Sequence, residues 1–180
     1  EALYDLGSLY ETGRGVEKDY AEAARLYRKA AEQGSVAAQY SLGEMHYYGQ
    51  GVARDYAESV RWYLKAAEQG SPDAENNLGY MYENGRGVDQ DYEEAAKWYR
   101  KAAEHGFARA ETNLGYMYEN GQGVPQDYGE AVRWYRKAAE QGFARSQPHL
   151  ASMYYFGRGV AKDYAEAVRW YRKAAEQGNM

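Results

Sequence analysis

The stretch GRGVDQDYEEA, residues 85–95, combines two glycines with acidic and aromatic side chains that could do chemistry. A G-x-G segment can cradle a phosphate, and Asp91 with Glu94 could serve as an acid–base pair or as metal ligands. The pattern is not unique, however, because it begins at five positions: Gly13, Gly49, Gly85, Gly121 and Gly157. An active site needs one special constellation of residues, so five copies favour a structural role.

The G-x-G segments lack the other residues of known phosphate sites. They have neither the third glycine of a dinucleotide fingerprint nor the G-K-[ST] of a P-loop, and they follow predicted helices instead of strands. Asp91 and Glu94 have the spacing of a helix capping box, which recurs as Asp19/Glu22, Asp55/Glu58, Asp127/Glu130 and Asp163/Glu166. We therefore predict that the two glycines end one helix and that the aspartate starts the next.

Composition excludes several functional classes. The net charge is −5 with both signs interspersed, which indicates neither a nucleic-acid surface nor a polybasic membrane patch. No apolar run approaches the roughly 18 residues of a membrane span. The chain has no cysteine, so disulfides and thiolate zinc sites are excluded. His46, His105 and His149 lie in different contexts and favour packing over metal ligation, so we expect no metal and no cofactor.

A repeat of 36 residues organises the whole chain. Its phase is marked by glycines 34, 70, 106, 142 and 178, which divide one domain, residues 1–180, into repeats 1–34, 35–70, 71–106, 107–142 and 143–178. In the third repeat Ala74, Leu78 and Met81 form one stripe of a helix between Ser71 and Gly85. A second amphipathic helix runs from Asp91 to Gly106. The chain is thus predicted to be all-α, a right-handed superhelical solenoid of five helix-turn-helix repeats.

Two features inside the first helix of each repeat lead to further predictions. Glycines 7, 43, 79 and 115 stand in the helix interior, where glycine costs about 1 kcal/mol relative to alanine, so a neighbouring helix should approach closely. In the fifth repeat Pro148 occupies an interior position and removes a backbone hydrogen bond. We predict that this helix starts late or is distorted.

The pattern A-x-x-x-L-G-x-M-Y-x-x-G-x-G-V-x-x-D-Y-x-E-A-x-x-W-Y-x-K-A-A-E-Q-G resembles the Sel-one-like repeat, a relative of the tetratricopeptide repeat. The resemblance covers essentially the whole chain. It implies a non-enzymatic adaptor that binds proteins or peptides, of bacterial origin, with the compartment open between cytoplasm, periplasm and secretion. Some cysteine-rich members are linked to penicillin binding or β-lactamase activity. No serine here has a lysine three residues on, as the S-x-x-K motif of such enzymes requires.

Positions that differ between the repeats predict where a partner binds. They lie three, four and seven residues apart on the first helices and share a face opposite the Ala/Leu/Met stripe. In tetratricopeptide relatives this face lines a concave groove, and by resemblance we expect a bound peptide there. Tyrosine suits such a surface because it combines contact area with a polar tip. The candidate residues are Tyr40, Glu44, Tyr47, Tyr48, Asn76, Tyr80, Glu83, Asn84, Arg109, Thr112, Tyr116, Glu119, Asn120, Arg145, Tyr155 and Phe156.

Other interpretations stay open. Free variation could mark only solvent exposure, and the tryptophans at 62, 98, 134 and 170 could form a stacking ladder, although packing between repeats is favoured. The array could be a structural spacer, possibly consensus-derived or engineered, that associates end to end and exposes Trp170 or Tyr171 on its final helix. Residue 1 enters mid-helix, which suggests a fragment of a longer protein. A cell-wall or β-lactam enzyme is the least favoured class.

Overall fold

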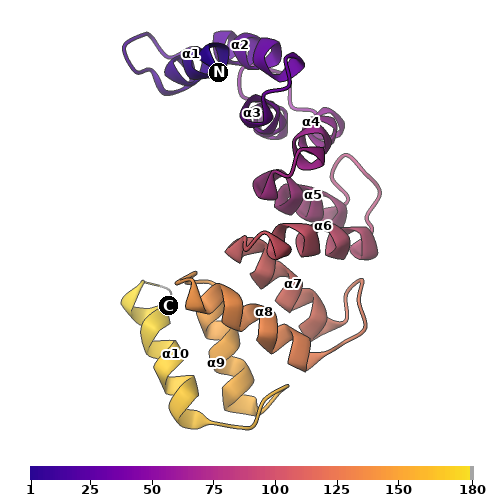
Figure 1. Ribbon diagram of the computed structural model, residues 1–180, viewed down its shortest axis with the longest axis vertical. Coiled ribbons are helices and arrows are strands. Elements are labelled where there is room, and N and C mark those ends of the chain that lie inside the picture. The colour runs from indigo at the N-terminus through magenta and orange to yellow at the C-terminus, as the bar shows by residue number, and fades with distance from the viewer. Residues whose placement is uncertain (179–180) are drawn as a thin grey trace. The chain divides into compact units, whose positions relative to one another are not determined.

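The fold is all-helical. The computed structural model describes residues 1–178, and within that range it contains ten α-helices and no strand (Figure 1). Odd-numbered helices, here called A helices, open each repeat, and even-numbered helices, the B helices, close it. Their bounds are α1 Ala2–Thr12, α2 Tyr20–Glu32, α3 Val36–Tyr48, α4 Tyr56–Glu68, α5 Pro72–Asn84, α6 Tyr92–Glu104, α7 Ala108–Asn120, α8 Tyr128–Glu140, α9 Ser146–Phe156 and α10 Tyr164–Glu176. The predicted helix-turn-helix repeat is confirmed.

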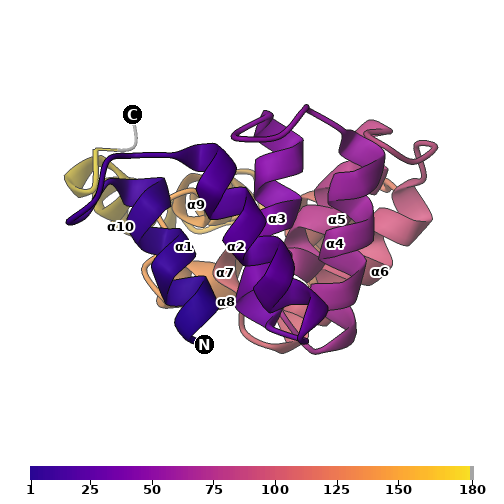
Figure 2. The same ribbon diagram turned by 90° about the horizontal axis from the view of Figure 1, so that it is seen from above.

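The helices group into two compact units, Glu1–Gln90 with α1–α5 and Asp91–Met180 with α6–α10. In each unit every helix packs against the helices that precede and follow it in the chain. In the first unit the A-to-B turns α1–α2 and α3–α4 lie along the upper edge in Figure 2. Each unit is therefore a stack of helical hairpins in which a B helix lies between two A helices of successive repeats.

Alanine and one tyrosine per repeat dominate the core of each unit. In the first unit the α2 residues Ala23 and Tyr27 pack against Leu42 and Met45 of α3, all at most 1% exposed. The second unit repeats this arrangement with Ala131 and Tyr135 against Leu150 and Met153. Small residues on one helix and large ones on the next allow close packing without a Leu/Ile/Val core.

The predicted helix boundaries are confirmed, with one correction. Gly85 caps α5 in the left-handed conformation at φ 62°, and the Asp55 carboxylate accepts the amide of Glu58 at the start of α4. A capping box would also need Glu58 to accept the amide of Asp55, but that amide donates to the carbonyl of His46 at 2.9 Å. Glu58 instead pairs with Arg61 at 3.0 Å. The aspartate is thus a cap, and the glutamate forms an ion pair along the helix.

The second glycine of the G-x-G segment serves contact between repeats, a role that the sequence prediction missed. A β-carbon on Gly87 would overlap the backbone of Tyr56 at the start of the preceding B helix. The same overlap recurs for Gly51, Gly123 and Gly159, whereas Gly15 in the first repeat has no atom within 4 Å of such a β-carbon. Glycine is therefore required where one repeat stacks on another.

The predicted close approach inside the A helices is also observed. A β-carbon on Gly43 would lie 2.5 Å from the ring of Tyr63, and one on Gly115 would lie 2.8 Å from the ring of Tyr135. The tyrosine ring of the B helix thus occupies the space that a side chain on the A helix would fill. Packing explains why a poor helix former stands in mid-helix.

The fifth A helix starts late, as Pro148 predicts. Helix α9 begins at Ser146, whereas the equivalent α7 begins at Ala108, which corresponds to residue 144. Arg145 precedes α9 with no side-chain capping bond. Pro148 consequently falls in the first helical turn, where its missing amide has no intrahelical acceptor to lose.

Candidate functional site

The candidate residues lie on one side of the A helices, called here the A-helix face. In α3 this face carries Tyr40, Glu44, Tyr47 and Tyr48, spaced by four, seven and eight residues, while Leu42 on the opposite side is fully buried. The aromatic side chains of this face reach solvent: Tyr48 is 60% exposed and Tyr80 is 36% exposed. By contrast, the four framework tyrosines of the B helices at 27, 63, 99 and 135 are at most 1% exposed.

In the first unit, the face ends in a cluster of aromatic rings around Tyr47. Its ring centroid lies 4.8 Å from Tyr48, 5.2 Å from Tyr56 and 6.4 Å from Tyr80. The Arg86 guanidinium carbon lies 5.5 Å from the Tyr47 centroid and 5.1 Å from the Tyr80 centroid, and an Arg86 amino group donates to the Tyr47 hydroxyl. We call these five residues the Tyr47 cluster; cation–π contacts fix its arginine.

Nearer the middle of α3, a half-buried carboxylate stands beside a tyrosine. Burial raises the pKa of Glu44 above its usual range, and the carboxylates of Glu11 and Asp73 raise it further. Hydrogen bonds from Tyr40 and Asn77 favour the ionised form and oppose this shift in pKa. The Tyr40 ring in turn packs 5.8 Å from the buried ring of Tyr63. Glu44 is therefore held in place by its neighbours and faces two further carboxylates.

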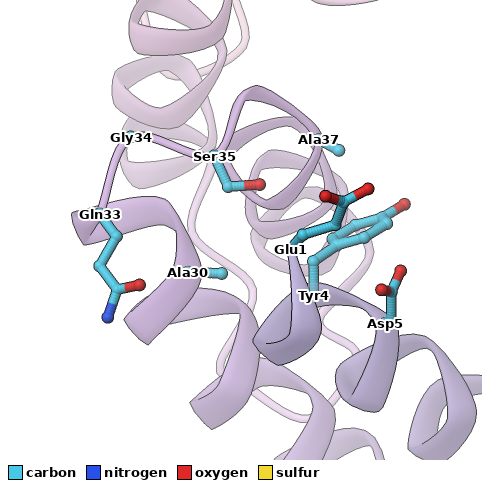
Figure 3. Close-up of a pocket in the computed structure, with 8 residues that line it drawn as sticks. All are labelled: Glu1, Tyr4, Asp5, Ala30, Gln33, Gly34, Ser35 and Ala37. Atoms are coloured by element: carbon cyan, nitrogen blue, oxygen red, sulfur yellow. The ribbon is translucent and has the colours of Figure 1, made fainter.

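A hollow opens at the beginning of the same face. It has a volume of about 500 Å³ and lies between α1, the end of α2 and the start of α3. Figure 3 shows the Tyr4 ring and the carboxyl groups of Glu1 and Asp5 projecting to the same side of α1. The remaining lining residues are Ala30, Gln33, Gly34, Ser35 and Ala37. The wall of this hollow thus combines an aromatic ring with acidic groups.

In the second unit the face carries a different mixture of charges. Glu119 accepts a hydrogen bond of 2.8 Å from the Tyr135 hydroxyl and lies 3.9 Å from a guanidinium nitrogen of Arg158. The Tyr155 ring lies 4.9 Å from that of Phe156 and 5.3 Å from that of Tyr164. The remaining candidates Arg109, Tyr116 and Arg145 are exposed.

Four candidates are either buried or hydrogen-bonded to the backbone. Asn76 and Thr112 are buried, at 4% and 7% exposure, so a bound partner would not reach them, which differs from the expectation that they line the groove. Asn84 and Asn120 are exposed, but their amide nitrogens donate to backbone carbonyls one turn earlier. Glu83, the last candidate, is half-buried. Asparagine donors for a peptide backbone are therefore weaker candidates than the tyrosines.

The sequence comparison missed Tyr56, Tyr164 and Arg86, which complete the aromatic clusters. The first two begin the B helices α4 and α10, whereas the candidates were drawn from the first helix of each repeat. Arg86 lies between the glycines of a G-x-G segment, where arginine and glutamine alternate along the chain. That alternation was a signal that this position does more than form the turn. A residue needed only for the turn would not have to reach the preceding repeat, as Arg86 does.

The tryptophans and the possible metal ligands are explained by their structural environments. Trp62, Trp98 and Trp134 are at most 9% exposed, with a lysine ammonium 4.0–4.4 Å above each ring. Because they are buried, these three tryptophans offer no stacking platform to bases or sugars. Across residues 1–178 no three His, Cys, Asp or Glu side chains are grouped as a metal site requires. No helix in the same range is long and apolar enough to cross a membrane.

Comparison with known proteins identifies the family. The Sel1 repeat model matches residues 1–35, 36–71, 72–107, 108–143 and 144–179, so the chain belongs to the Sel1 repeat family, as its sequence pattern predicts. Members of this family are typically protein-interaction scaffolds. No curated protein matches the chain.

Solved structures share both fold and sequence with it. One is c5321, described as a protective antigen of uropathogenic Escherichia coli with an SLR fold, with a TM-score of 0.97 and 47% identity over 99% of this chain. The Sel1 repeat protein of Oxalobacter formigenes gives 0.93 and 42%, also over 99% of this chain and over 71% of its own. Cysteine-rich protein B of Helicobacter pylori gives 0.58 and 29%, over 72% of this chain and 92% of its own. This chain spans only 38% of the c5321 chain.

Proposed function

We propose that this chain is a non-enzymatic scaffold that binds a protein or peptide segment on the A-helix face of its units. The observation that carries the proposal is the distribution of aromatic side chains. The framework tyrosines of the B helices at 27, 63, 99 and 135 are buried, whereas Tyr48, Tyr80 and Tyr116 of the A helices are 36–60% exposed. Exposed aromatic groups placed together in this way are characteristic of recognition surfaces.

The geometry favours recognition over chemistry. Two candidate carboxylates of the face have structural environments: Glu119 accepts a hydrogen bond from Tyr135, and Glu44 lies beside Tyr40 and Asn77. Glu119 also raises the pKa of His149, but that histidine packs its ring on Tyr135, the residue that already donates to Glu119. The tyrosines, in contrast, offer large rigid contact area at a small cost in side-chain entropy.

Selection from a random peptide library tests the proposal. The full chain is used as bait, and selected peptides are tested against the double variant Tyr80→Ser, Tyr116→Ser. Serine is already present at this repeat position as Ser8 and Ser152, so the fold should tolerate it. We expect affinity to fall at least tenfold, because each aromatic anchor contributes more than about 1 kcal/mol.

A control variant changes an exposed tyrosine of a B helix. Tyr171 lies on α10 and is 43% exposed, and Tyr171→Ser should leave peptide affinity unchanged. Peptides that bind the serine double variant as tightly as the original chain would refute the A-helix face as the site. Sedimentation across a range of concentrations checks the competing interpretation, because an array that self-associates gains mass with concentration.

A further inference from the structure

The charges of the first unit are divided between its two kinds of helix. Helices α1, α3 and α5 contain no lysine or arginine, while their acidic residues are Asp5, Glu11, Glu44, Asp73, Glu75 and Glu83. The B helices α2 and α4 of the same unit carry lysine and arginine as well as glutamate. Glu75 is buried, and through the other five residues the A helices contribute only negative charge to the surface that we propose as the docking face.

Carboxylates on the A helices and carboxylates on the B helices differ in how they are neutralised. On the B helices, Glu22 pairs with Arg25 at 2.5 Å and Glu58 with Arg61 at 3.0 Å, each within one helical turn. On the A helices, Glu44 has no cation among the described residues; it is hydrogen-bonded to Tyr40 and Asn77. Its position in mid-helix also excludes a capping role, which could explain an acidic residue in a first helical turn.

The packing of Glu44 makes it unfavourable to leave its carboxylate without a cation. Its carboxylate is partly withdrawn from water, which raises its pKa, and the negative charges of Glu11 and Asp73 on the neighbouring A helices raise it further. A cation beside Glu44 would offset the burial and the repulsion together. Glu11 is only partly compensated, by a 2.6 Å hydrogen bond from the Tyr27 hydroxyl.

Two arginines beside this face, Arg86 and Arg54, are already engaged with its tyrosines. Arg86 is held in the Tyr47 cluster at the carboxyl end of α3, where its guanidinium contacts three tyrosine rings and the Tyr47 hydroxyl. Arg54 lies over the ring of Tyr56. The face thus has an aromatic end, where an arginine is already stacked on tyrosine, and an acidic middle without a cation.

We propose that the A-helix face of the first unit binds a segment of its partner that carries lysine or arginine, with the cationic side chain beside Glu44. This inference rests on the proposed function and specifies the partner. Charge complementarity selects the cation, because α1, α3 and α5 carry acidic residues and no lysine or arginine, and the exposed tyrosines of the same face accommodate the neighbouring residues.

The second unit provides a comparison within the same chain. Position 73 of the third repeat corresponds to Arg109 in the fourth and Arg145 in the fifth, and position 44 corresponds to Tyr116 in the fourth and Ser152 in the fifth. The acidic surface is therefore a property of particular repeats and not of the framework. The same positions supply substitutions that the fold already contains.

The experiment uses the library-selected peptides and two variants of the full chain. Asp73→Arg with Glu44→Ser removes the acidic middle of the face. Glu68→Arg with Glu32→Ser makes the same change in net charge on exposed residues near the ends of α4 and α2. We expect selected peptides to be enriched in lysine and arginine and to lose at least tenfold in affinity for the first variant, with little loss for the second.

A second measurement follows the ionisation of the Glu44 carboxylate. In the unchanged protein, the pKa of Glu44, measured from its side-chain carbon resonance, should fall when a lysine-containing selected peptide is bound. Equal losses in both variants would identify non-specific attraction and overturn the inference. Neutral or acidic peptides that require Tyr80, in the first unit, would also overturn it while leaving the proposed function intact. Failure to select any peptide that depends on Tyr80 or on Tyr116 would count against the function itself.

Discussion

The backbone of Tyr56, the first residue of α4, occupies the space in which a β-carbon on Gly87 would stand. This relationship joins two successive repeats, because Gly87 belongs to the turn after α5. It is formed without side chains and is therefore independent of which residues the repeats carry elsewhere. The A-helix face can vary while the spacing of the repeats stays fixed.

Replacing Gly87 with alanine should destabilise the chain beyond the cost of its backbone conformation. Gly70 is the matched control, since it also has positive φ, at 80°, but has no atom within 4 Å of an added β-carbon. We expect Gly87→Ala to cost about 1–3 kcal/mol more than Gly70→Ala, because it adds overpacking against backbone to the conformational strain. Urea denaturation followed by circular dichroism measures the difference. Equal losses would show that the contact between repeats is not tight.

The repeat period and the helix boundaries were predictable because they depend on local residues. Capping aspartates, terminal glycines and the Ala/Leu/Met stripe act within one or two turns, so the sequence carries them directly. The contact of Gly87 with Tyr56 was not predictable from turn chemistry, since it joins residues from different repeats. For the same reason Arg86 was missed: its tyrosine partners come from three separate helices. The burial of Asn76 and Thr112 likewise depends on the rotation of each A helix in the stack.

The roles of Asp55 and Glu58 can be separated by substitution. Asp55→Ala removes the acceptor for the amide of Glu58 and should cost about 1 kcal/mol of unfolding free energy. Glu58→Ala removes an exposed ion pair with Arg61, whose side chain is 74% exposed, and should cost less than about 0.5 kcal/mol. Both are measured by thermal or urea denaturation. A loss for Glu58→Ala as large as that for Asp55→Ala would restore the capping box.

Pro148 should be the cause of the short α9. Pro148→Thr introduces the residue found at this position in α7, Thr112, and restores a backbone amide. We expect the helix to begin near Ala144 and the stability to rise by up to about 1 kcal/mol. Hydrogen exchange gives the direct measurement, since the new amide at 148 should be protected. An amide that exchanges as fast as in a free peptide would place the cause of the late start in Phe143–Ser146 instead.

Acidification should weaken the second unit through His149. Its ring stacks on Tyr135 with centroids 4.9 Å apart, and burial lowers the pKa of this histidine, with Arg145 lowering it further and Glu119 opposing both. The unfolded chain therefore takes up a proton at a higher pH than the folded chain does. Stability from this residue is fully present above the pKa of a free histidine and is lost as the pH falls through it.

The matched variant is His149→Asn, because Asn77 and Asn113 occupy this position in two other repeats. The raised pKa values of Glu44 and Glu111, both caused first by burial, act in the opposite direction, since protonation of these carboxyls favours the folded chain. Only the difference in stability between the original protein and the His149→Asn variant therefore isolates the effect of the histidine. We expect the unfolding temperature of the histidine protein to fall relative to that of the asparagine variant between pH 7.5 and pH 5. Parallel pH profiles would show that His149 accepts its proton as readily in the folded chain as in the unfolded one.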